Sequence, residues 1–104
     1  MRALLPILFL AACASPSPDL FGAARGEVEL GGIRFVVFHD GETAEVVRMG
    51  YLSRAARAPV PGLMAEAAAR VSGCAVIAGS MTTRIPGDTG VARFALDCAR
   101  PPGG

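Results

Sequence analysis

The sequence contains no lysine, asparagine, glutamine or tryptophan, and it has a single histidine, His39. One histidine cannot fill a closed zinc site, which takes several nitrogen or sulfur ligands. It also allows only one Ser–His–acid triad, and Ser53, Ser72 and Ser80 all lack the G-x-S-x-G frame of a nucleophile elbow. The missing residue types stand beside abundant alanine, glycine and arginine, which indicates the coding bias of a GC-rich genome and not a function.

Long apolar runs and an excess of either charge are absent as well. No run reaches the ~18 residues that a membrane-spanning helix needs, and the formal net charge is +1 at pH 7. The sequence therefore has no strong basic field to attract nucleic acid. Gly31-Gly32 and the segment from Gly87 to Gly90 fit turns better than a phosphate-binding loop. We expect no nucleic-acid partner, no cofactor and no metal site.

The N-terminus has the features of an export signal. Met1-Arg2 gives a short positive start, and the apolar stretch 3–12 that follows is too short for a membrane anchor. Leu10-Ala11-Ala12-Cys13 at its end resembles the lipobox of bacterial lipoproteins, and the resemblance covers this segment alone. It implies that Cys13 receives a diacylglyceryl group on its sulfur, that the chain is cut before Cys13 and that the new amino group is acylated. The alternative is an ordinary secretory signal with a stray cysteine near the cut.

The resemblance divides the chain into four parts. We expect a signal peptide over 1–12, a lipidated cysteine with a Ser/Pro tether over 13–21, a small domain over 22–100 and a flexible tail over 101–104. Each buried methylene of an acyl chain contributes ~0.8 kcal/mol, and more than one chain anchors a protein stably. No aspartate directly follows Cys13, which by analogy with enterobacterial sorting favours the outer membrane over the inner. The expected location is the periplasmic side of the cell envelope.

The two remaining cysteines, Cys74 and Cys98, predict one disulfide. With Cys13 lipidated, they form an even pair in an oxidising compartment. A catalytic or redox thiol is the alternative, but the sequence has no C-x-x-C motif and no helix begins after either cysteine.

The patterns around these cysteines predict two strands, 74–82 and 91–98, with a turn at Pro86-Gly87-Asp88 between them. Folding the strands about Pro86 puts Cys74 opposite Cys98. The same register puts Val76 opposite Leu96 and Ala78 opposite Phe94, all on one face.

The rest of the chain predicts a hairpin and a helix. Residues 33–38 are rich in β-branched and aromatic side chains, Asp40-Gly41 is typical of a hairpin turn, and 43–49 form the return strand. Residues 27–30 suggest a short edge strand that Gly31-Gly32 breaks. A helix over 61–72, with Pro61 in its first turn and Gly73 as its left-handed cap, presents apolar residues at helical spacing. We expect an α+β two-layer domain, a mostly antiparallel four-stranded sheet (β-β-α-β-β) with one helix on it.

Two groups of polar side chains are candidates for chemistry or binding. His39 stands beside Asp40 and near Glu42, which suggests a base with carboxylates at hand, but a polar hairpin turn is the favoured interpretation because a turn supplies no cavity. The second group is Arg48, Arg54 and Arg57, a candidate surface for an anionic partner whose alternative is a solvated loop.

The strands at 33–38 and 74–78 are apolar at almost every position, although one helix cannot cover both faces of a sheet. Either both faces are covered or the helix-free side meets a partner. The favoured hypothesis is a membrane-tethered, non-catalytic module that binds another envelope protein. The second is a small inhibitor of a lysozyme-like hydrolase or an immunity-type factor, which would use loop 51–60 or loop 84–90. The third and weakest is an enzyme that depends on His39.

Overall fold

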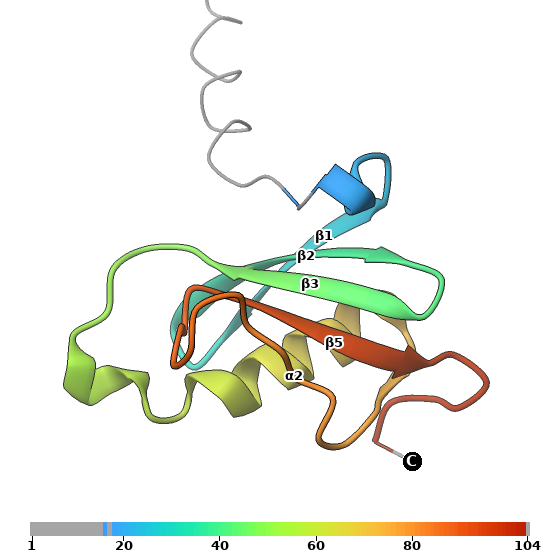
Figure 1. Ribbon diagram of the computed structural model, residues 1–104. Helices are drawn as coiled ribbons and strands as arrows, with labels where there is room; N and C mark the ends of the chain where they lie inside the picture. Colours follow the sequence, from blue (N-terminus) through green and yellow to red (C-terminus); the bar gives the residue numbers. More distant parts are fainter. Residues whose placement is uncertain (1–15, 17, 104) are drawn as a thin grey trace, which may run out of the picture.

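The computed structural model of the chain describes residues 16 and 18–103. It has two layers, a curled antiparallel sheet and one α-helix that crosses one face of the sheet (Figure 1). The strand order is β1-β2-β3-β5-β4. In chain order the elements are η2 (Pro18–Leu20), β1 (Ala24–Leu30), β2 (Ile33–Asp40), β3 (Thr43–Arg48), η3 (Arg54–Arg57), α2 (Val60–Ser72), β4 (Ala75–Val76) and β5 (Val91–Asp97). The predicted α+β class is confirmed.

The sheet has five strands, and the expectation of four is wrong. The extra strand is β1, which pairs with β2 along its full length from Ala24↔His39 to Leu30↔Ile33. Gly31 and Gly32 do not break it. Their φ angles of 60° and 79° form a two-residue turn that joins β1 to β2 as a hairpin. Only glycine adopts two successive left-handed conformations at no steric cost, so this pair specifies the turn.

The hairpin predicted at Asp40-Gly41 is confirmed. Asp40 and Thr43 face each other at the ends of β2 and β3, and Gly41 takes φ 60° in the turn between them. His39 does not lie in the turn. It lies inside β2, where it pairs with Ala24 of β1 on one side and with Ala44 of β3 on the other.

Helix α2 follows the sequence prediction closely. Pro61 occupies its first turn, and Gly73 ends it at φ 76° with its backbone N–H donating to the carbonyl oxygen of Ala69. The helix packs across the sheet, and it approaches Gly26 of β1 closely: a Cβ added there would lie 2.6 Å from Val71 Cγ1. A side chain at residue 26 would hold the two layers apart.

The prediction of a strand over 74–82 is wrong beyond its first residues. Val76 pairs with Leu96 as predicted, but β4 ends there and the expected pair Ala78–Phe94 does not form. A turn replaces it, in which the backbone N–H of Ser80 donates to the carbonyl oxygen of Ile77 and Gly79 takes φ 74°. The chain rejoins the sheet edge only at the isolated bridge Thr82↔Arg93. The turn near Pro86 is confirmed by the hydrogen bond from the Asp88 N–H to the Ile85 carbonyl oxygen.

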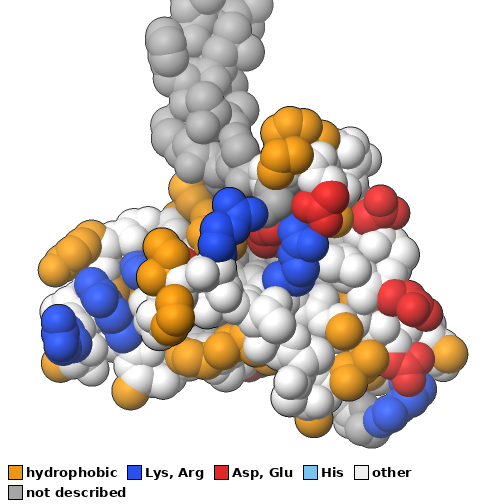
Figure 2. Space-filling view, viewed as in Figure 1, with side chains coloured by type: hydrophobic (Ala, Val, Ile, Leu, Met, Phe, Trp, Pro, Cys, Tyr) orange, Lys and Arg blue, Asp and Glu red, His pale blue; other side chains and the backbone are white. Residues whose placement is uncertain are grey.

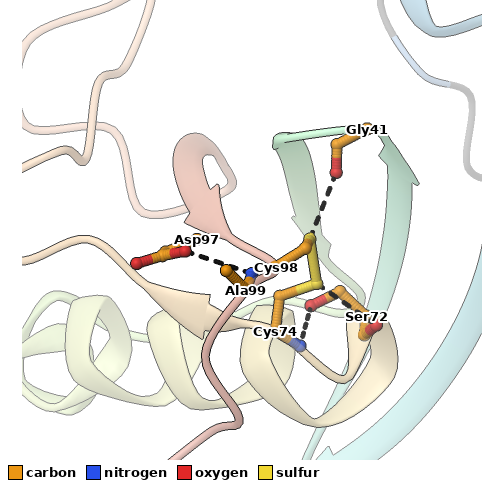
Figure 3. Close-up of a disulfide and its surroundings, with 6 residues drawn as sticks. All are labelled: Gly41, Ser72, Cys74, Asp97, Cys98 and Ala99. Carbon is orange, nitrogen blue, oxygen red and sulfur yellow. Dashed lines mark hydrogen bonds between the residues drawn. A yellow bond between two sulfur atoms is a disulfide. The ribbon is translucent and has the colours of Figure 1, made fainter.

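The predicted disulfide between Cys74 and Cys98 is formed, with the two Cα atoms 4.4 Å apart (Figure 3). It ties the exit of α2 to the end of β5. The Cys98 sulfur also lies 3.4 Å from the carbonyl oxygen of Gly41, in the turn between β2 and β3. A disulfide sulfur carries no hydrogen, so this is a packing contact. Three segments that are distant in sequence thus meet at one corner of the domain.

The main core lies between the sheet and α2. Its residues alternate along each strand and share the helix-bearing face: Leu30, Phe35, Val37, Ala44, Val46, Ala92, Phe94 and Leu96 from the strands, with Val60, Met64, Ala67 and Ala68 from α2. This face accounts for the apolar positions of α2 and for three of those in β2, Ile33, Phe35 and Val37. The other two apolar side chains of β2, Val36 and Phe38, face away from the helix.

Candidate functional site

The chain's own N-terminal segment covers part of the helix-free face of the sheet. Val36 and Phe38 point to this face of β2 and are buried, although neither belongs to the core under α2. Leu20 of η2 is only 3% exposed, and η2 contacts β2 (Figure 1). These three residues form a second, small apolar cluster. The apolar pattern of strand 33–38 is explained in this way, because both faces of β2 are covered.

An ionic network holds the same segment to the neighbouring strands. The Arg93 guanidinium on β5 donates two hydrogen bonds to the Asp19 carboxylate, at 2.8 and 2.9 Å, and one to Glu45 Oε1 at 3.0 Å. Glu45 and Arg93 are directly opposite each other on β3 and β5. Glu45 is 4% exposed, whereas the Asp19 side chain is 60% exposed. We call Asp19, Leu20, Glu45 and Arg93 the clasp.

The ion pair between Asp19 and Arg93 shifts the pKa of both side chains. The hydrogen bonds from Arg93 hold the pKa of the Asp19 carboxyl below its usual value, and the charges of Arg93 and Arg84 act in the same direction. The hydrogen bonds to Asp19 and Glu45 raise the pKa of Arg93 above its already high usual value. Arg93 is therefore a permanent cation, and a bidentate pair of this kind fixes orientation as well as distance.

Beside the clasp lies an open hollow of about 640 Å³. The N-terminal segment bounds it with Pro16, Pro18 and Asp19, and the connection between β4 and β5 bounds it with residues 82–85 and Asp88. Glu45, Val91, Ala92 and Arg93 complete the lining. The hollow thus combines a fixed cation, a buried carboxylate and apolar walls.

Several exposed apolar side chains lie at this hollow or next to it. Ile85 is 64% exposed and Val91 is 38% exposed, and both line the hollow. Met81, also exposed, directly precedes Thr82 in the lining. Figure 2 shows basic and acidic side chains in contact near η2, with hydrophobic side chains beside them. A hollow, an ion-pair network and exposed apolar side chains therefore coincide at this place.

The candidate base His39 is not gathered into a comparable site. It is half-buried at the end of β2, and by strand alternation it lies on the helix-bearing face, opposite the clasp. Within the described part of the chain, no group of three or more His, Cys, Asp or Glu side chains is placed to hold a metal ion.

The arginines proposed as a partner surface have mainly internal contacts. Arg48 Nε donates to the Thr89 carbonyl oxygen at 2.8 Å, and its Nη1 donates to the Gly50 carbonyl oxygen. Arg57 Nε donates to the Leu52 carbonyl oxygen at 3.1 Å. The Arg48 bonds hold a loop to strand β3, and the Arg57 bond holds η3 to the loop before it, so both side chains have a structural use. Arg54 is exposed at the start of η3, and a partner role for the three stays a prediction.

The lipidation site Cys13 and the signal peptide 1–12 lie outside the described residues. The range predicted for the tether, 13–21, overlaps η2, whose Leu20 is buried on the sheet. Among the described residues, no helix is long and apolar enough to cross a membrane.

The sequence analysis missed the clasp. A charged residue at the centre of each of two strands, Glu45 in 43–48 and Arg93 in 91–97, was the available signal. Opposite charges on neighbouring strands attract across the sheet. Recognising the pair required knowing that β3 and β5 are neighbours, and that pairing depends on the unpredicted strand order.

Comparison of the chain with protein family models, with curated proteins and with solved structures found no match in any of the three.

Proposed function

We propose that this protein is a membrane-tethered, non-catalytic binding module of the bacterial cell envelope, and that it binds another envelope protein through the hollow beside the clasp. The observation that carries the proposal is the coincidence of exposed apolar side chains, Ile85 and Val91, with the fixed charges of Arg93 and Glu45 at one open hollow. Apolar contact area gives affinity, and fixed charges give orientation to a protein partner.

The envelope location is supported by two independent features. The segment Leu10-Ala11-Ala12-Cys13 has the lipobox pattern, and the Cys74–Cys98 disulfide is typical of proteins outside the reducing cytoplasm. Both features account for all three cysteines of the chain without a free thiol.

A non-catalytic role is supported by how the polar residues are used. The members of the clasp bond to one another, and Arg48 and Arg57 bond to backbone carbonyls. His39 lies on the opposite face of the sheet from the hollow. General acid–base catalysis needs a titrating group within reach of a bound substrate, and these positions do not supply one together.

Site-specific photocrosslinking in intact cells tests the proposal. A photoreactive side chain at residue 85 is expected to give one discrete adduct with an envelope protein, and adding Val91→Asp is expected to abolish it. The matched control is the same side chain at residue 66, exposed on α2 in the other layer. Adducts that form equally at residues 85 and 66, or that survive Val91→Asp, would contradict a binding site at the hollow.

A hydrolase inhibitor is the second candidate, and one observation favours it. Tyr51 is 85% exposed in the connection between β3 and α2, and a large exposed side chain on a loop is suited to enter an enzyme cleft. An assay of lysozyme activity with the purified domain and with Tyr51→Ala separates the two functions. Inhibition that is lost in Tyr51→Ala would favour the inhibitor over the binding module.

A further inference from the structure

The N-terminal segment is held to the sheet at two kinds of contact. Leu20 is buried against the helix-free face, and Asp19 is fixed by two hydrogen bonds to Arg93. Two backbone hydrogen bonds, from the Phe21 N–H to the Pro18 carbonyl oxygen and from the Ala23 N–H to the Leu20 carbonyl oxygen, shape the segment between these contacts and β1. The tether therefore does not leave the domain at the start of β1.

This attachment changes how far the domain can stand from a lipid on Cys13. An extended chain spans at most 3.3–3.6 Å per residue, so the path from Cys13 to Asp19 is at most about 20 Å. If Asp19 and Leu20 were released, the first held residue would be Ala24, and the path would lengthen to roughly 38 Å. The clasp halves the reach of the tether.

The clasp also decides which side of the domain is near the anchor. Asp19 is held on the helix-free face, where it lines the hollow together with Arg84 and Ile85. Helix α2 covers the opposite face. Phe21, 67% exposed, lies directly after the clasp segment. A short tether fixed on one face keeps that face toward the membrane.

We propose that the clasp formed by Asp19, Leu20, Glu45 and Arg93 holds the helix-free face of the domain against the membrane that carries the lipid on Cys13, with α2 turned away from it. The proposal rests on the lipid anchor of the proposed function. It adds that any partner at the hollow is reached along the same membrane surface and not across the periplasm.

Energy transfer from tryptophan to a labelled lipid tests the orientation, because the chain has no tryptophan of its own. The probe variants are Ile85→Trp, exposed at the hollow on the side of the clasp and outside the tether, and Glu66→Trp, exposed on α2. The lipidated protein is placed in phosphatidylcholine vesicles that contain a headgroup-labelled acceptor lipid. Transfer is expected to be stronger from residue 85 than from residue 66. Equal transfer, or stronger transfer from residue 66, would overturn the proposal.

A second pair of variants tests the clasp itself. Adding Asp19→Asn and Leu20→Ser to each probe is expected to remove the difference between residues 85 and 66, because the domain then turns on a longer tether. The matched control is Glu27→Gln, which breaks the exposed Arg25–Glu27 ion pair on the same face and is expected to keep the difference. Circular dichroism checks that the clasp variants stay folded.

High salt provides a second measurement, on the chain with the clasp unaltered. Because salt screens exposed ion pairs, it is expected to reduce the difference in energy transfer between the two probes. A difference that persists in the folded clasp variants and in high salt would overturn the role of the clasp.

Failure of the lipid anchor is distinguishable from failure of the clasp. If mass spectrometry finds no lipid on Cys13, the chain from residue 13, oxidised at Cys74 and Cys98, is coupled at the Cys13 thiol to a maleimide lipid. The orientation is then measured with the same two probes. A preference for residue 85 in that preparation supports the clasp even where the natural anchor is absent.

Discussion

The two faces of the sheet are built in different ways. The helix-bearing face packs Phe35, Val37 and their neighbours under α2 in one continuous apolar core. The helix-free face buries two apolar side chains, Val36 and Phe38, near Leu20, and a charged pair, Glu45 and Arg93, continues the same surface. One face is therefore specified by the regular periodicity of apolar residues, whereas the other depends on a short segment outside the sheet.

The largest expected effect tests the core under the helix. Phe35→Ala removes a fully buried ring from the centre of this core and is expected to lower the free energy of unfolding by about 3–5 kcal/mol. Phe38→Ala on the other face is the matched comparison and is expected to cost less, because its surroundings collapse more easily around the vacated space. Chemical denaturation measures both values. A larger loss for Phe38→Ala would reverse the ranking of the two faces.

The disulfide closes the corner at which α2, β5 and the β2–β3 turn meet. It links residues with a sequence separation of 24, for which the loop-entropy model gives a stabilisation of ~3.5 kcal/mol. The double variant Cys74→Ala/Cys98→Ala is expected to lose about that much in a denaturant titration. A chain whose midpoint does not move on removal of the disulfide would contradict this account of the corner.

Leu20→Ala probes the closure of the helix-free face. Burial of a leucine side chain makes the expected loss ~2–3 kcal/mol. The loss is expected to be accompanied by faster hydrogen exchange in η2 and at the Phe21 and Ala23 amides, whereas α2 keeps its protection. Uniform loss of protection across both layers would show that the two faces are not separable.

Replacing each of two glycines by alanine is expected to change the stability of the fold in opposite directions. Gly26→Ala places a Cβ 2.6 Å from Val71 Cγ1, and overpacking of this kind costs ~1–3 kcal/mol. Gly62→Ala in the first turn of α2 meets no atom within 4 Å, and the higher helix propensity of alanine favours it by up to ~1 kcal/mol. Thermal unfolding of the two variants gives the comparison. Equal shifts of the melting temperature in the two variants would exclude the close approach of α2 to Gly26.

The smallest expected effect is on pH dependence. The pKa of Asp19 is lowered in the folded chain by Arg93, with Arg84 acting in the same direction and Glu45 sharing the Arg93 guanidinium. A carboxyl group with a lowered folded pKa stabilises the fold above its unfolded pKa, ~4, and this contribution is lost as the pH falls through the folded pKa. Asp19→Asn is therefore expected to flatten the stability profile below about pH 4 and to leave its shape at pH 7 unchanged. A profile identical to that of the unaltered chain would contradict the pairing.

Much of the helix-bearing layer could be predicted from the sequence. The helix with its Gly73 cap, the hairpin at Asp40-Gly41, the pairing of Val76 with Leu96 and the disulfide follow from local patterns, because each depends on neighbours that are close in sequence or joined by a turn. Residues 24–26 of β1 were missed because alanine, arginine and glycine have low strand propensity, and pairing with β2 overrides it.

The helix-free face could not be predicted in the same way. The strand expected over 74–82 ends at Val76 because Gly79 takes a left-handed conformation and turns the chain. The clasp joins Asp19, Glu45 and Arg93 from three distant segments, and no local pattern reports such a meeting. The sequence did predict that strand 33–38 is apolar on both faces, and Leu20 provides the cover that this pattern requires.

We propose that this domain is anchored by lipid at residue 13 and operates at a membrane surface. The decisive measurement is mass spectrometry of the protein isolated from its native membranes. The expected N-terminal peptide begins at Cys13 and carries the mass of a diacylglyceryl group and a further acyl chain. An unmodified residue 13, in a chain that still begins at Met1 or is cut elsewhere, would overturn the proposal.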